Sequence, residues 1–261
     1  MRHRIDLNAD LGEGFGPYRY GADRELLPLV TSANIACGWH GGDPGVMREA
    51  VRTARACDAA IGAHPGYPDR MGFGRRDMAL LPQEVTDGIL YQLGALEGLC
   101  RAEGTSVSYV KPHGALYNAA AHDPVLAAAV VEAVRIWGLV LLCPWGSAMA
   151  EAARAAGVPV AREFFADRGY QDDGALVPRG QPGAVLSQPE AVCRRVIRAV
   201  KEGVVETASG GEIAAEMDSI CLHGDTPAAV ELAARIRQAL EAEGVLLRPF
   251  TEGGGHLGTD G

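Results

Sequence analysis

The chain has 261 residues and a formal net charge of −9, from 24 Lys and Arg against 33 Asp and Glu. Hydrophobic residues at 48% and charged residues at 22% are typical of a globular protein with a sizeable core, and they exclude a disordered or fibrous chain. The acidic balance and the lack of a long basic run argue against a partner that is nucleic acid or an anionic membrane surface.

Other features of the composition bear on where the protein works. The N-terminus carries Arg2 and Arg4 without an apolar segment behind them, so we expect no signal peptide. The most apolar stretch, residues 126–145, is interrupted by Glu132 and Arg135 and predicts a helix followed by a strand, not a membrane span. Six cysteines lie far apart with no CxxC pair, as expected of reduced thiols. A cytoplasmic protein is therefore predicted.

Along the chain, short apolar runs typical of buried strands alternate with segments of helical periodicity. The predicted strands span residues 4–9, 32–37, 60–63, 109–114, 140–143, 158–164, 219–222 and 245–249, with a β excursion at 204–215 that turns at Gly210-Gly211. The predicted helices span residues 23–29, 44–54, 82–103, 124–137, 148–156, 189–201 and 228–243. Asp43-Pro44 is typical of an N-cap followed by proline at the first helical position.

This alternation of strands and helices favours a parallel sheet covered by helices. A barrel carries its active-site residues at the C-terminal ends of several strands, whereas a doubly wound sheet gathers them at one switch point. Polar candidates here follow many predicted strands, so we expect an α/β fold: a distorted (β/α) TIM-like barrel of seven or eight mostly parallel strands. We assign residues 1–250 to a single barrel domain and expect a disordered tail at 251–261.

One segment, Tyr109-Val110-Lys111-Pro112-His113-Gly114, carries two bases towards the end of a predicted strand. Side chains alternate along an extended chain, so Val107, Tyr109, Lys111 and His113 are expected on one face. Packing alone does not readily explain two bases on one strand face, which points to a functional role for Lys111 and His113.

Six sequence blocks occur together in this order in the LamB/YcsF family. They are DLNADLGE at 6–13, NIACGWHGGDP at 34–44, GAHPGYPD at 62–69, KPHGALYN at 111–118, EFFADR at 163–168 and HGDTP at 223–227. The chain resembles this family from about residue 4 to residue 248, and six blocks in order are far more specific than any single motif.

The resemblance implies the A subunit of a bacterial ATP-dependent 5-oxoprolinase, with a barrel of the deacetylase-like superfamily. Such an enzyme hydrolyses the cyclic amide of 5-oxo-L-proline to L-glutamate, coupled to ATP hydrolysis, together with two partner subunits, B and C. No GxxxxGK[ST] phosphate loop occurs in this chain, so the co-substrate ATP is expected to bind wholly or partly to the partners. Whether a divalent metal is bound stays open.

Opening a lactam requires a general base, a proton donor for the ring nitrogen and support for developing negative charge. The catalytic candidates are Asp10, His40, His64, Lys111, His113 and His223. The substrate-binding candidates are Asn8, Glu13, Glu163, Asp167, Arg168 and Asp225. Lys111 and Arg168 suit a substrate carboxylate or phosphoryl group. Which residue is the base stays open.

Two other classes of function fit the same residues. A stand-alone, deacetylase-like amidohydrolase would use Asp10 with His40, His64 or His113 to activate water on a divalent metal. A non-catalytic subunit would only bind a metabolite. Cys37 is interpreted as a small buried thiol instead of a nucleophile, and His122 as a surface residue beside a helix start.

Overall fold

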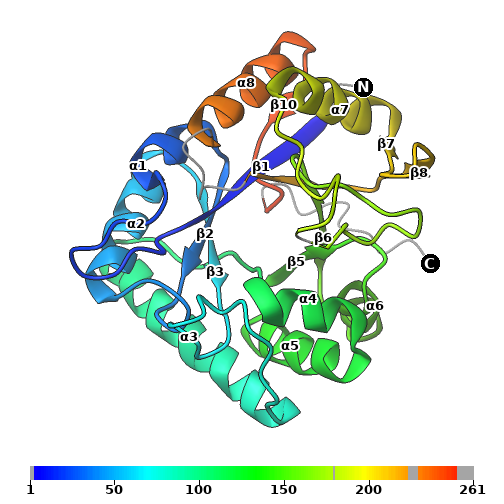
Figure 1. Ribbon diagram of the computed structural model, residues 1–261. Helices are drawn as coiled ribbons and strands as arrows, with labels where there is room; N and C mark the ends of the chain where they lie inside the picture. Colours follow the sequence, from blue (N-terminus) through cyan, green and yellow to red (C-terminus); the bar gives the residue numbers. More distant parts are fainter. Residues whose placement is uncertain (1–2, 179, 223–228, 252–261) are drawn as a thin grey trace.

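The computed structural model describes residues 3–178, 180–222 and 229–251, and its centre is a closed barrel of seven parallel strands (Figure 1). Each strand pairs with the next, and the last pairs with both the sixth and the first, which closes the barrel. The strands are β1 (Arg4–Leu11), β2 (Ser32–Ala36), β3 (Ala60–His64), β4 (Tyr109–Val110), β5 (Val140–Pro144), β6 (Val160–Phe165) and β9 (Ser219–Leu222). The predicted TIM-like α/β barrel is confirmed, with seven strands in the ring.

Helices lie around the outside of this ring (Figure 1). They are α1 (Asp23–Leu26) with a 3₁₀ turn η1 (Leu27–Leu29), α2 (Pro44–Ala56), α3 (Pro82–Ala102), α4 (Gly114–His122), α5 (Pro124–Trp137), α6 (Ala148–Ala155), α7 (Pro189–Glu202) and α8 (Ala229–Ala242). The Asp43 carboxylate accepts hydrogen bonds from the amides of Gly45 and Val46, so the predicted N-cap of α2 is confirmed.

Three short strands lie outside the ring. The predicted β excursion is the antiparallel hairpin of β7 (Val204–Glu206) and β8 (Glu212–Ala214). β10 (Leu246–Leu247) pairs in parallel with the start of β1. Of the tail expected after the barrel, positions 252–261 lie outside the described residues.

Two expectations around β4 were wrong. Helix α4 was not predicted, because its N-cap is His113, which makes no side-chain capping hydrogen bond and is not one of the residue types that usually mark a helix start. The strand itself begins at Tyr109, so Val107 does not share its inward face. Val107 packs instead in the apolar cluster between the barrel and the helices, while Tyr109 belongs to a separate inner cluster.

That inner cluster fills one end of the barrel with Tyr109, Leu142, Ala161 and Phe250. The Tyr109 ring packs against Phe250, with ring centroids 4.9 Å apart. On the neighbouring strand, Gly62 is in register with Tyr109, and a Cβ atom at Gly62 would lie only 2.1 Å from the ring. Glycine at this position therefore makes room for the tyrosine.

Above the inner cluster the barrel is lined by polar side chains that hydrogen-bond to one another. The register of β1 sets Asp10 beside Asn34 of β2, and Asp6 beside Ser219 of β9. Asn34 donates to Asn8 and Asp10 and accepts from the Tyr109 hydroxyl, at 2.6–2.8 Å. Because these buried polar groups are hydrogen-bonded to one another, they form a rigid layer, which we call the polar floor. This layer lies below the C-terminal ends of the strands.

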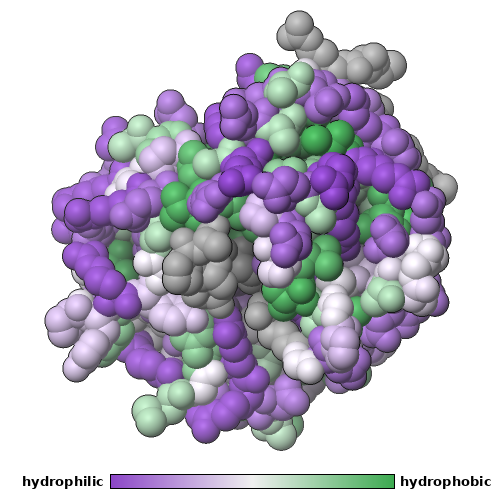
Figure 2. Space-filling model, turned by 45° about the horizontal axis from the view of Figure 1, so that its top comes forward, coloured by the Kyte–Doolittle hydropathy of each residue, from purple (hydrophilic) through white to green (hydrophobic). Residues whose placement is uncertain are grey.

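The outer surface agrees with the composition. Figure 2 shows a largely hydrophilic outer surface on the face it presents, with hydrophobic side chains gathered towards the middle. Within the described parts of the chain, no helix is long and apolar enough to cross a membrane. All six cysteines are free thiols.

Candidate active site

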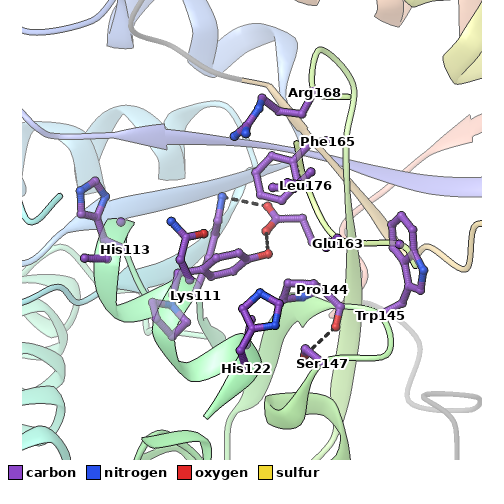
Figure 3. A pocket seen from close by; sticks show the side chains of 18 of the residues that line it. Lys111, His113, His122, Pro144, Trp145, Ser147, Glu163, Phe165, Arg168 and Leu176 are labelled. Atoms are coloured by element: carbon purple, nitrogen blue, oxygen red, sulfur yellow. Dashed lines mark hydrogen bonds and ion pairs between the residues drawn. The ribbon is translucent and has the colours of Figure 1, made fainter. Parts of the chain in front are cut away.

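A cavity of about 620 Å³ opens at the C-terminal ends of the barrel strands. Its wall includes Asp10 of β1, His64 of β3, Lys111 after β4 and Glu163 of β6, so separate strands contribute its charged groups. In Figure 3, Lys111 and Glu163 lie side by side in the cavity, with Arg168 and Phe165 on one side and His122 and Ser147 on the other. The volume is within the range of small-molecule sites.

Lys111 reaches across the barrel from β4 and pairs with two carboxylates. Its Nζ lies 2.9 Å from Asp10 Oδ1 and 2.8 Å from Glu163 Oε1. Lys111 and Glu163 are almost completely buried, whereas 19% of the Asp10 side chain remains accessible. One cation thus lies between two anions, and Asp10 is the most accessible member of the group.

The pKa directions of these groups follow from burial and charge. Burial alone would lower the pKa of Lys111, but the nearby Asp10, Cys221 and Glu163 outweigh it and hold this pKa well above its usual value. Burial likewise raises the pKa of Asp10, but the neighbouring His64 and Lys111 outweigh it and hold that pKa well below its usual value. At neutral pH the site therefore contains an ammonium and an ionised Asp10.

Tyr117 of α4 supports Glu163 from the far side. Its hydroxyl donates to Glu163 Oε2 at 2.5 Å, so both oxygens of this carboxylate have a partner. Burial, and next the charge of Glu163, raise the pKa of Tyr117 well above its usual value, which keeps the hydroxyl protonated. Glu163 is held rigidly and is suited to positioning Lys111.

A second group, which we call the histidine cluster, consists of Glu13, His40, His64 and His113. One ligand atom from each residue lies within 4.8 Å of those of the other three. The rings of His40 and His113 stack in parallel, with centroids 3.6 Å apart. Imidazole nitrogen and carboxylate oxygen are common metal ligands, so among the described residues this is the group that could hold a metal ion.

Backbone packs closely against the two stacked rings. At Gly74, which has φ +62°, a Cβ atom would lie 2.8 Å from the Cβ of His40 and 2.9 Å from the ring of His113. The neighbouring carbonyl of Phe73 lies 2.8 Å from His113 Nε2. The loop before α3 therefore fixes the rings of the histidine cluster.

Burial also determines the charge state of the stacked rings. It is the main cause that lowers the pKa of His40 well below its usual value, with His113 and His64 adding to the effect. The pKa of His113 is lowered to about 3, again chiefly by burial and then by His64. Both rings are neutral at physiological pH.

The structure brings most of the candidates from the sequence together. Asp10, His64, Lys111, His113, Glu163 and Arg168 line the cavity, and Glu13 and His40 contact His113 directly behind its wall. Asn8 lies in the polar floor, where its oxygen is 3.4 Å from Lys111 Nζ. Asp167 does not line the cavity, and His223 and Asp225 lie outside the described residues.

Arg168 has a more structural setting than the sequence suggested. Its Nε donates to the Ala184 carbonyl and its Nη2 to the Val177 carbonyl, so it braces the loop over the cavity that it lines. Cys37 is buried, and burial raises the pKa of its thiol to about 12, which agrees with its interpretation as a core residue.

Sequence reasoning missed several residues of the cavity wall, among them Tyr117, His122 and Trp145. His122 was expected only at the surface, but it also lines the cavity as the last residue of α4. Tyr117 follows His113 by four residues, which would have been a signal had the helix between them been recognised.

Comparison with known proteins agrees with the sequence blocks. A model of the LamB/YcsF family matches residues 5–254. A protein of Pyrococcus horikoshii is 51% identical over 251 residues, covering 95% of this chain and 98% of its own length, and one of Symbiobacterium thermophilum is 53% identical over 244 residues, covering 93% and 94%. Both carry the name of the A subunit of 5-oxoprolinase.

A solved structure resembles this one along almost its whole length. It is the crystal structure of the lactam utilization protein from Thermus thermophilus, which is 50% identical and has a TM-score of 0.91. The match covers 94% of this chain and 99% of that one.

Proposed function

The chain belongs to the LamB/YcsF family, and we propose that it is the subunit of an ATP-dependent 5-oxoprolinase in which the cyclic amide of 5-oxo-L-proline is opened to L-glutamate. Two further subunits, B and C, complete the enzyme. The names of the relatives support this proposal, as does that of the Thermus lactam utilization protein. The observation that carries it is the group of Asp10, Lys111 and Glu163 in the wall of a cavity of small-molecule size.

The reaction explains why such a group is useful. A lactam carbonyl is a poor electrophile, and transfer of the γ-phosphoryl group of ATP to its oxygen would make the carbon attackable. A water then gives up a proton as its oxygen bonds to that carbon. The ring C–N bond breaks, the nitrogen gains a proton, and the carbon keeps the phosphoryl group as an acyl phosphate. A second water then displaces inorganic phosphate from this acyl phosphate and leaves L-glutamate. A base and a proton donor on opposite sides of a small ring are therefore required.

Asp10 is the residue we assign as the base. It is ionised, it is the most accessible carboxylate of the group, and its Oδ2 lies 3.5 Å from His64 Nε2. Lys111 holds Asp10 and Glu163 in place and offers a fixed positive charge near the carbonyl oxygen. Arg75 and Arg168 in the cavity wall suit the carboxylate of the substrate.

We assign ATP binding wholly or partly to the partner subunits, since this chain has no phosphate loop of the GxxxxGK[ST] type. The six free thiols support a reducing compartment, the cytoplasm, as the place of work.

Reconstitution tests the proposal. The purified chain is mixed with its partner subunits, 5-oxo-L-proline and ATP, and glutamate release is followed. We expect release only when the chain, the partners and ATP are all present. Glutamate released at the same rate without this chain would show that the proposal is wrong.

A stand-alone metal-dependent amidohydrolase is the second candidate, and the histidine cluster is the observation that favours it. It predicts that the chain alone hydrolyses simple amides without ATP and that a chelator abolishes this activity. The same reconstitution, with ATP and partners omitted in turn, distinguishes the two functions.

A further inference from the structure

Two buried imidazoles in the histidine cluster face each other at a short distance. His64 Nδ1 lies 2.7 Å from the Lys111 carbonyl oxygen, and His113 Nε2 lies 2.8 Å from the Phe73 carbonyl oxygen. A carbonyl only accepts hydrogen bonds, so each of these nitrogens carries a hydrogen. The other nitrogens, His64 Nε2 and His113 Nδ1, point at each other at 3.0 Å. Either a proton or a cation beside both nitrogens would offset the repulsion of their lone pairs.

Glu13 and His40 complete a pocket of donor atoms around this contact. Glu13 Oε1 lies 3.5 Å from His113 Nδ1 and 3.2 Å from His40 Nε2. All three histidines are buried, and the Glu13 side chain is only 8% exposed. A carboxylate oxygen and imidazole nitrogens enclosed together are a donor set typical of a buried metal site.

The spacing of these atoms matches a four-coordinate metal. Zinc bonds nitrogen and oxygen at about 2.0–2.2 Å, so a tetrahedral site separates its ligand atoms by roughly 3.3–3.6 Å. Of the three contacts, the one of 3.5 Å lies within that range and those of 3.0 and 3.2 Å lie just below it. No pair exceeds 4.8 Å, so the widest pair has to close by roughly an ångström around the ion.

We propose that Glu13, His40, His64 and His113 bind one divalent transition-metal ion, with zinc as the best match to three nitrogens and one oxygen. The hydrogen bonds from His64 and His113 to backbone carbonyls are those that orient histidine ligands in metal sites. The inference stands on these four side chains and does not depend on the proposed function.

The ion would lie behind the cavity wall, since His64 and His113 line the cavity but Glu13 and His40 do not. Four protein ligands make a closed site of the structural kind. It would tie together the C-terminal ends of β1, β2, β3 and β4, because His64 ends β3 and the other three ligands follow the remaining strands. The ion thereby fixes His64 beside Asp10.

Metal binding to the full chain tests the proposal. The chain is stripped with a chelator, dialysed and titrated with Zn²⁺ in a calorimeter, and metal content is measured by mass spectrometry. We expect one Zn²⁺ per chain, a higher melting temperature on binding, and the visible spectrum of tetrahedral Co²⁺ when cobalt replaces zinc. A stripped chain that takes up neither Zn²⁺ nor Co²⁺ would overturn the proposal, because His64 and His113 must then share a proton.

Variants identify the ligands. We expect His113→Ala and the nearly isosteric Glu13→Gln to weaken Zn²⁺ binding by more than about 100-fold, beyond the usual effect of losing an outer hydrogen-bond partner. His122→Ala is the matched control, since it removes a histidine of the same cavity from outside the cluster and should still bind one Zn²⁺. Should His113→Ala fail to fold, Glu13→Gln decides alone. Unchanged affinity and stoichiometry in Glu13→Gln would contradict the assignment.

Discussion

Replacing Lys111 by methionine tests the electrostatic arrangement on which the site depends. Methionine keeps much of the length of the side chain and fits a buried position, but it removes the positive charge. In the wild type, carboxylate oxygens of Asp10 and Glu163 lie 2.9 and 2.8 Å from the Lys111 ammonium, so both carboxylates would lose their cationic partner. Glu163 is fully buried and would keep only the Tyr117 hydroxyl as a partner for its charge.

The expected loss of stability is large. Removing one partner of a buried ion pair typically costs about 3–5 kcal/mol, because the remaining charge is left without compensation. A domain of roughly this size loses about 2–4 °C in melting temperature per kcal/mol, so Lys111→Met should melt about 6–20 °C below the wild type.

The loss of stability in Lys111→Met should depend on pH in a defined direction. The raised pKa of Lys111 gives stability that is present below its ordinary value of 10.5 and is lost as pH rises through the folded value. The depressed pKa of Asp10 gives stability that is present above its ordinary value of 3.8 and is lost as pH falls through the folded value. Without the ammonium, burial would be offset less, and the pKa of Asp10 would lie higher than in the wild type. The variant would then take up protons on acidification, and its deficit should shrink from pH 7 towards pH 5.

The assay is thermal unfolding of Lys111→Met beside Asp10→Asn and Glu163→Gln. Each of the latter two leaves Lys111 paired with one carboxylate, so each should lose less than half as much stability as Lys111→Met. If Lys111→Met melts within about 2 °C of the wild type, Lys111 does not hold these carboxylates as we have argued.

Three further substitutions test the frame around the site. Gly62→Ala should lower the free energy of unfolding by roughly 1–3 kcal/mol, measured by urea unfolding, because its Cβ atom would lie 2.1 Å from the Tyr109 ring. An unchanged urea midpoint would mean that the ring moves aside at no cost. Asp43→Ala should lose about 1 kcal/mol with the N-cap of α2, measured in the same way, and no loss would show that the cap is dispensable. Burial raises the pKa of Asp6 to about 6, so the folded state binds the Asp6 proton more tightly than the unfolded state does. The wild type should therefore gain roughly 2 kcal/mol over Asp6→Asn as pH falls from 7 to 4, and equal pH profiles would contradict this.

The barrel was predictable because its signals are local. Each short apolar run between helical segments marks a buried parallel strand, and the polar residues directly after the runs mark the C-terminal mouth of the barrel. Asp10, His64 and Lys111 were found in this way. Helix α4 was missed because Gly114 gives no signal of a helix start. As a consequence, Tyr117 of this helix was not identified as the hydrogen-bond partner of Glu163.

The division of the site into two groups was not predictable, because it depends on distances across the barrel. The sequence shows Glu13 and His40 in separate loops, and only the closed ring brings both to His113. Nor could the sequence show that Arg168 bonds to backbone carbonyls of its own loop. Pairing between segments far apart in the chain is decided by the register of the sheet, which no single segment encodes.

The central claim is that the amide ring opens beside Asp10, and the rate of one reconstituted variant tests it most directly. With partner subunits, 5-oxo-L-proline and ATP at saturation, Asp10→Asn should release glutamate about 10²–10⁴-fold more slowly than the wild type. Asp87→Asn makes the same chemical change on the exposed face of α3 and should leave the rate unaltered. An Asp10→Asn complex that is folded and as fast as Asp87→Asn would contradict the account.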